Sequence, residues 1–396
     1  MIKCNNLKTH HNHDFSGHFC INEACPLYGR MGEDNIRLKG HCGKNQRLHE
    51  LICSRCHKAF SENHGTPFYN GHLPRKQVLD IVRHLIEGCG IRGTARLLGH
   101  HPDTIVRCLR KVAAHVLIVL NSLLNGIGCT EIQMDEFWTF VRKKEKNASA
   151  KEKLNAGFGD RWIHLAIDTI SRLIIAWNVD RRTQKATDVL VSTVAARLEN
   201  PRDVLYTSDQ HGPYKAALEN LNSTEEARCQ ETDGPCAETG ASPYKPGMVY
   251  ATVKKTYRKN RPVQVERTLE MGTLDDLRQR LDESPVSNNV NTSFVERLNN
   301  TFSQDVRRVT RKTLGFSKEA DVLDAHVVLE IGSYNLVRNH SSLIVTEKIS
   351  DGSTVKLRRT PAMAAGLTNA PWTYLDLLTY KVSPLNPTTE TVSMAA

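Results

Sequence analysis

The order of predicted strands and helices around two aspartates restricts the fold of this chain more than any other feature. Asp135 stands in the middle of the first predicted strand, and Asp209 directly follows the last one. Alternating apolar residues predict the elements strand, strand, strand, helix and strand, at residues 130–141, 162–168, 173–179, about 187–198 and 203–207. A ribonuclease-H-like core has this order, and its first strand lies parallel to its fourth. We therefore expect a mixed-sheet α/β domain that brings Asp135 and Asp209 side by side.

A polar helix predicted over about 291–310 carries a third carboxylate, Glu296. The helix is expected to turn four apolar residues to the core, Val295, Leu298, Phe302 and Val306. Glu296 then points along the sheet edge toward the two aspartates. Glu136, next to Asp135, is expected on the opposite face of its strand, because side chains alternate along a strand.

Three converging carboxylates without basic partners repel one another at neutral pH. Hard divalent cations such as Mg²⁺ or Mn²⁺ relieve that repulsion. Two such ions about 4 Å apart can activate a water or a 3′-hydroxyl and stabilise the leaving oxygen of a phosphodiester. A single aspartate at a strand end is more often a cap or turn residue, so the prediction depends on Asp135, Asp209 and Glu296 together.

Four of the eleven cysteines have the spacing of metal ligands. Cys20 and Cys25 form one pair, and Cys53 and Cys56 form a second about thirty residues later. Two such pairs favour a closed tetrahedral Zn²⁺ site in a zinc ribbon, and a redox pair or unrelated thiols are the alternatives. Because the first sixty residues contain little apolar material, a metal would supply stability that a core cannot.

A helix-turn-helix is predicted after this module. Residues 78–86 carry an amphipathic stripe, residues 91–98 form a short helix, and a turn at 99–101 precedes a helix over 103–115. The outer face of that last helix is basic, as in helices that enter the major groove of DNA. An ordinary helical hairpin has the same apolar pattern.

Positive charge gathers in two parts of the chain, which has 396 residues and a net charge of +10. Residues 72–116 contain eight Lys/Arg against three acids, and residues 296–318 contain six against two. Each cluster accompanies one of the motifs above, so the charge favours double-stranded DNA as a partner over a merely solvated face. The candidate DNA contacts are Arg92, Arg96, Thr104, Arg107, Arg110, Lys111, Arg297, Arg307 and Arg308.

The chain resembles the transposases of insertion sequences, in particular the insertion-sequence-one family and its single-frame relatives. The resemblance covers about residues 20–378. The motifs that carry it are Arg55-Cys56-His57-Lys58-Ala59-Phe60, Glu87-Gly88-Cys89-Gly90-Ile91-Arg92-Gly93-Thr94, Met134-Asp135-Glu136-Phe137-Trp138, Ser208-Asp209-Gln210-His211-Gly212, Val295-Glu296-Arg297-Leu298-Asn299 and Thr360-Pro361-Ala362-Met363.

This resemblance implies a DDE transposase that acts through Asp135, Asp209 and Glu296. Such an enzyme cuts DNA at the terminal inverted repeats of its element and joins the freed 3′-hydroxyl to target DNA, working as a homodimer or higher oligomer. Members often carry a basic residue seven positions after the catalytic glutamate, but Ser303 stands there in this chain. Arg307, one helical turn further on, is the expected substitute.

The predicted domains are a zinc ribbon at 1–70, a helix-turn-helix at 71–125, the catalytic domain at 126–345 and a C-terminal tail at 346–396. The catalytic domain is expected to hold an insertion at about 223–285, with a flexible segment at 223–244 and a β-hairpin at 248–271. Residues beyond 384 are expected to be disordered.

Neither a membrane span of roughly 18 apolar residues nor the apolar core of a secretory signal is found in the sequence. We therefore expect a cytoplasmic prokaryotic protein with no membrane partner, associated with the nucleoid when bound to DNA. Two other functions remain open: a DNA-binding regulator with an inactive ribonuclease-H-like domain, and a related metal-dependent nuclease that does not join strands.

Overall fold

The computed structural model describes residues 14–43, 48–153, 157–231, 247–259, 261–310, 312–348 and 353–386. The chain forms two compact units, and the first of them is built from two segments that are distant in sequence. The described residues of the first unit belong to Met1–Arg75 and Leu378–Pro387, and those of the second unit belong to Lys76–Leu377. No helix in the described ranges is both long and apolar enough to span a bilayer.

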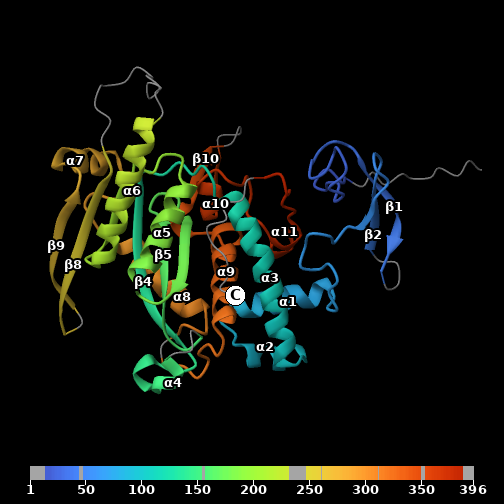
Figure 1. Cartoon of the computed structure of the whole chain (residues 1–396), viewed down its shortest axis with the longest axis horizontal. Coiled ribbons are helices and arrows are strands. Elements are labelled where there is room, and N and C mark those ends of the chain that lie inside the picture. The colour runs from blue at the N-terminus through green and yellow to red at the C-terminus, as the bar shows by residue number, and fades with distance from the viewer. Residues whose placement is uncertain are drawn as a thin grey trace, which may run out of the picture. The chain divides into compact units, whose positions relative to one another are not determined.

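A six-stranded mixed sheet organises the second unit (Figure 1). Its strands are β4 (Glu131–Val141), β5 (Gly159–Asp168), β6 (Ile174–Asp180), β7 (Leu205–Asp209), β8 (Val249–Arg258) and β9 (Arg261–Met271). They lie in the order β6-β5-β4-β7-β8-β9, and β7 is parallel to both β4 and β8, whereas the other neighbours are antiparallel. The predicted order of elements and the parallel pairing of the first and fourth strands are confirmed, and this mixed α/β architecture is compatible with a ribonuclease-H-like core.

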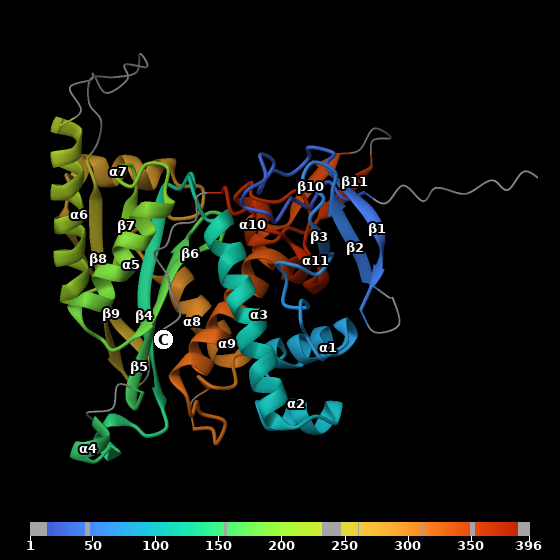
Figure 2. The same cartoon turned by 45° about the vertical axis from the view of Figure 1, so that its right-hand side comes forward.

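Helices cover both faces of this sheet. Helices α5 (Gln184–Arg197) and α6 (Gly212–Glu231) lie against one face, and α8 (Ser293–Asp305) and α9 (Ala320–Gly332) lie on the other side (Figure 2). The predicted apolar stripe of α8 is buried at Val295, Leu298, Phe302 and Val306. These residues determine which side of α8 is buried. They also place Asn299 of α8 within hydrogen-bonding distance of Asp135 on β4.

The hairpin at 248–271 forms as predicted, but it is not a separate insertion. The first half of β8 is buried and pairs with β7, for example Tyr206 opposite Tyr250, so β8 and β9 extend the sheet to six strands. The segment at 223–244 also differs from the prediction, because α6 continues to Glu231; residues 232–244 lie outside the described ranges. Helix α7 (Leu274–Glu283) follows β9 and begins with a capping box between Thr273 and Asp276.

Three helices precede the sheet, namely α1 (Arg75–Ile86), α2 (Ile91–Leu98) and α3 (Pro102–Leu123). The turn between α2 and α3 begins at Gly99, whose positive φ of 69° suits a residue without a Cβ. Helix α3 is longer than predicted, because the apolar residues after 115 pack against α9. The arrangement as a helix-turn-helix that binds DNA stays a prediction.

The first unit contains a small antiparallel sheet of β1 (Ile36–Cys42), β2 (Leu48–Cys53) and β3 (Ala59–Ser61). Part of the predicted C-terminal tail folds onto it: Ser383 Oγ donates to Gly29 O at 2.6 Å, and Lys381 Nζ donates to Glu62 O at 2.8 Å. A Cβ on Gly29 would meet Leu385 at 2.8 Å, so this close approach requires glycine.

The rest of the predicted tail contains β10 (Val345–Lys348), β11 (Thr354–Leu357), α10 (Pro361–Ala364) and α11 (Tyr374–Thr379). Disorder was predicted beyond residue 384, and residues 387–396 lie outside the described ranges, so the prediction stays untested there.

Candidate active site

The pairing of β4 with β7 places Asp135 and Asp209 on one face of the sheet. The last parallel pair joins Gln133 to Thr207, and each aspartate lies two residues further along its strand. Because side chains two residues apart share a face, both carboxylates turn to the same side just beyond the point where the two strands part. Carboxylate oxygens of Asp135, Glu136 and Asp209 all lie within 4.8 Å of one another. We call these three residues the acid cluster.

Glu136 belongs to the acid cluster although its neighbours lie on the other face of β4. Tyr214 Oη of α6 donates to it at 2.8 Å, and Arg182 Nε, just before α5, donates at 2.6 Å. Asp135 instead accepts from Asn299 Nδ2 of α8 at 2.8 Å. The two side chains therefore alternate as predicted, yet both reach the acid cluster, which lies just beyond Gln133, where the pairing of β4 with β7 ends.

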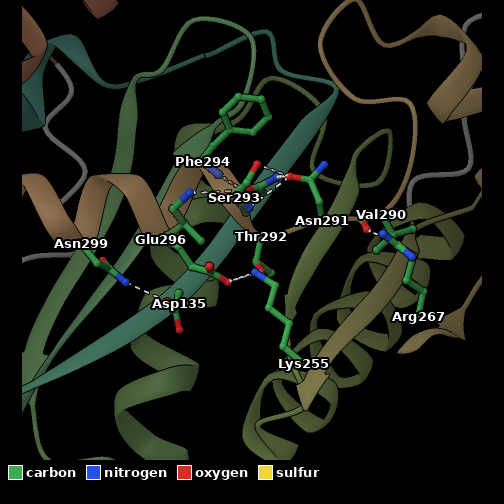
Figure 3. A network of polar contacts seen from close by, with 12 residues as sticks. Asp135, Lys255, Arg267, Val290, Asn291, Thr292, Ser293, Phe294, Glu296 and Asn299 are labelled. Atoms are coloured by element: carbon green, nitrogen blue, oxygen red, sulfur yellow. Dashed lines mark hydrogen bonds and ion pairs between the residues drawn. The ribbon is translucent and has the colours of Figure 1, made fainter. Parts of the chain in front are cut away.

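Glu296 projects from the first turn of α8 toward Asp135 (Figure 3). Its carboxylate accepts from Thr292 Oγ1 at 2.6 Å and forms an ion pair with Lys255 Nζ of β8. Asn299 lies three residues later on the same side of α8, and it holds Asp135 (Figure 3). Glu296 is not part of the acid cluster, but its charge contributes to raising the pKa of Asp135.

Burial is the main reason that the pKa of Asp135 rises to about 7, and the charges of Glu136 and Asp209 add to the effect. Burial also raises the pKa of Glu136, although Tyr214 and Arg182 oppose the rise. Counting Glu296, four carboxylates meet two cationic side chains, those of Arg182 and Lys255.

The residues at this site fit a hard divalent cation. All of the donors are carboxylate oxygens, and their negative charges outnumber the two cations, Arg182 and Lys255. Arg182 pairs with Glu136 and lies 3.7 Å from Asp209, with its guanidinium 4.8 Å from the ring of Trp162, so this one cation offsets only part of the negative charge.

Sequence reasoning missed four residues of this site, namely Glu136, Arg182, Asn299 and Lys255. The Asp135-Glu136 dipeptide was a signal for the first, and the Glu296-x-x-Asn299 spacing, which places two polar side chains on one helical face, was a signal for the third. Nothing in the local sequence singles out Arg182.

The four cysteines selected by spacing come together in the first unit. Sulfur atoms of Cys20, Cys25, Cys53 and Cys56 all lie within 4.8 Å of one another, and three of these residues are buried. The backbone N–H of Lys58 lowers the pKa of Cys56 to about 6, whereas burial raises the pKa of Cys20. This cluster is compatible with zinc.

The nine candidate DNA contacts differ in how they are presented. Arg92, Arg96, Arg107, Lys111, Arg297 and Arg307 are exposed, and Thr104 is partly exposed. Arg110 lies on α3 but binds Asp321 and Glu319 next to α9. Arg308 is only 9% exposed and lies in the wall of a cavity, not on the outer surface. Ser303 Oγ donates to Asn299 O, whereas Arg307 lies beyond the end of α8.

Comparisons with known proteins add little to this geometry. The sequence matches no family model and no curated protein. Among solved structures, the chain has a distant match to the Mos1 strand transfer complex, with 14% identity over 39% of this chain and 58% of that chain, and a TM-score of 0.17. A match at this level carries no argument, so the function must be inferred from the site itself.

Proposed function

We propose that this chain is a metal-dependent DNA transposase of the insertion-sequence type. The observation that carries the proposal is the acid cluster, whose half-buried Asp135 has a pKa of about 7 beside Glu136 and Asp209, with Glu296 directed toward it. Mg²⁺ or Mn²⁺ held by Asp135, Asp209 and Glu296 would activate a water or a 3′-hydroxyl and stabilise the leaving oxygen of a phosphodiester.

The surrounding residues orient these three carboxylates. Asn299 fixes Asp135, Thr292 fixes Glu296, and the backbone N–H of His211 donates to Asp209 at 3.1 Å. Anchoring of this kind holds metal ligands in place before the substrate arrives. Glu136 is a positioning residue, because its carboxylate is bound by Tyr214 and Arg182.

Recognition of the element's ends is assigned to the N-terminal part of the chain. A zinc ribbon at 1–70, with Cys20, Cys25, Cys53 and Cys56 as ligands, and a helix-turn-helix at 71–125 would bind the terminal inverted repeats. The domain at 126–345 would cleave and join strands, and a homodimer or higher oligomer would hold two ends together.

Strand transfer is the test. Labelled DNA fragments from both flanks of the reading frame are incubated with the protein, a target plasmid and Mn²⁺, and joined products are measured. We expect joining by the wild type and at least a 100-fold loss in both Asp209→Asn and Glu296→Gln. Asp275→Asn is the matched control, because Asp275 is 92% exposed on α7 and should retain full activity.

Each other outcome points to a different function. Cleavage without joining would indicate the nuclease, and DNA binding without either reaction would indicate the regulator. Cleavage that survives Asp209→Asn or Glu296→Gln would overturn the assignment of the carboxylates.

A further inference from the structure

A row of aromatic side chains continues along β4 beyond the acid cluster. Trp138 and Phe140 follow Glu136 at intervals of two residues, so they share its face of the strand. Their rings are stacked, with centroids 5.5 Å apart and an interplanar angle of 28°. The ring of Phe316 lies 5.1 Å from that of Phe140 at 30°. We call Trp138, Phe140 and Phe316 the aromatic shelf.

The position of Phe316 beside Phe140 is set by the next residue, Ser317, which pairs with β4. Ser317 pairs with Val141 at the end of β4, and the backbone N–H of Arg142 donates to Ser317 O at 2.8 Å. The segment after α8 thus takes the place beside β4 that β7 occupies nearer the acid cluster. The aromatic shelf is therefore built from two distant parts of the sequence, and Trp138 and Phe140 remain partly exposed.

A cavity of about 510 Å³ lies over the aromatic shelf. Among the described residues that line it are three cationic side chains and no carboxylate. The polar lining consists of Lys144, Arg308, Lys312, Thr139, Thr310 and Thr313. The ammonium of Lys144 lies 5.1 Å from the ring centroid of Trp138 and 5.8 Å from that of Phe140. A cavity of this size can hold part of a nucleic acid strand.

Arg308 is the buried member of this lining and is incompletely paired. Its Nη1 donates to Ser317 Oγ at 3.2 Å, and its Nε has no hydrogen-bond partner in the described part of the chain. Burial lowers the pKa of Arg308 to about 10, so it is still charged at neutral pH. The nearest acids, Glu319 and Asp321, bind Arg110 instead. A buried cation that is hydrogen-bonded to a hydroxyl and to no carboxylate is unfavourable, and a bound anion would stabilise it.

Aromatic faces, cations and hydroxyls together suit unpaired nucleotides. Bases stack on aromatic rings and phosphates pair with cationic side chains, whereas a paired duplex keeps its bases inside its own stack. Trp138 and Phe140 lie two and four residues from Glu136 on its face of β4, about 7 to 13 Å along the strand at ~3.3 Å per residue. That separation corresponds to a few nucleotides.

We propose that the aromatic shelf and its cavity bind unpaired nucleotides of the DNA strand that is cut at the acid cluster. This inference rests on the proposed function and adds a site for single-stranded DNA next to the reaction. The bases stack on Trp138, Phe140 and Phe316, and the phosphates are neutralised by Lys144, Arg308 and Lys312.

The test compares two fluorescent duplexes of one sequence, one blunt and one with a single-stranded 3′ tail of thymidines. Affinity is measured by anisotropy with no Mg²⁺ or Mn²⁺ added, so that no strand is cut. The wild type should prefer the tailed duplex. Trp138→Leu should lose roughly tenfold in affinity for the tailed duplex alone, and Trp138→Phe, which keeps an aromatic face, should retain most of the preference.

Two further variants complete the design. Trp372→Leu is the matched control, because Trp372 does not line the cavity and should keep the preference. Lys312→Gln changes an exposed side chain, so it tests the cavity without affecting the core even if Trp138→Leu fails to fold. Lys312→Gln should weaken binding of the tailed duplex. The slope of log affinity against log salt concentration should become shallower by about one, as expected for one lost phosphate contact.

The inference is overturned if the wild type shows no preference for the tail, or if folded Trp138→Leu and Lys312→Gln both keep it. Strand transfer by a protein that lacks the preference would refute the aromatic shelf as a binding site and leave the transposase assignment standing. A protein that bound neither duplex would refute both.

Discussion

Asp135→Asn should make the metal-free protein more stable, because the wild-type carboxyl is poorly placed to ionise. Burial, together with Glu136 and Asp209, raises its pKa from the ordinary 3.8 to about 7. The folded state therefore holds a proton that the unfolded state releases, and stability falls as the pH rises from about 4 to about 7. At ~1.36 kcal/mol per pH unit, the loss reaches roughly 4 kcal/mol above pH 7.

Replacing the carboxyl by an amide removes this loss. The amide oxygen can still accept from Asn299 Nδ2, so the contact to α8 is kept. Thermal unfolding at pH 8 should show a melting temperature higher on the order of 5–10 °C for Asp135→Asn, and little difference at pH 4. Asp275→Asn removes a carboxylate that is 92% exposed and should change nothing at either pH.

The same melting measurement is repeated with added Mg²⁺. A cation bound at the acid cluster stabilises the ionised form, so Mg²⁺ should raise the melting temperature of the wild type at pH 8 and have a much smaller effect on Asp135→Asn. The reasoning is refuted if the variant is no more stable than the wild type at pH 8, or if Mg²⁺ stabilises both equally.

Two other predictions concern the metal sites. Lys255→Met should raise the affinity for Mn²⁺ roughly threefold in calorimetric titrations, because the ammonium of Lys255 competes with the ion for Glu296. Lys254→Met is the control, since it removes an ammonium that lies 3.7 Å from Glu266. Equal effects of the two variants would refute the competition. Cys53→Ser should lower the zinc content, measured by mass spectrometry, from about one ion per chain to almost none. Retention of zinc by that variant would exclude the four-cysteine site.

Several features of the fold could be predicted from the sequence because they depend on neighbouring residues. Alternation predicts β4, and the 3.6-residue repeat predicts α1 and the buried side of α8. The short spacing within each cysteine pair restricts both thiols to one turn, which is why Cys53 and Cys56 could be selected without a structure.

The position of the acidic residues was only partly predictable. The order of strands implied that Asp135 and Asp209 meet, because the first and fourth strands of such a sheet are parallel. That Glu136 joins them could not be predicted, since it depends on where β4 and β7 part. The partners Arg182 and Asn299 come from segments more than forty residues away, and only packing selects them.

Pattern alone therefore determined several of the elements and which side of them is apolar, because local backbone geometry and side-chain period act over a few residues. The tertiary structure decided the rest. It joined β8 to the sheet, buried Arg308 beneath the aromatic shelf, and placed Lys381 and Ser383 against the four-cysteine unit. Each of these contacts joins surfaces that are distant in sequence, and their complementarity is created only when the chain packs.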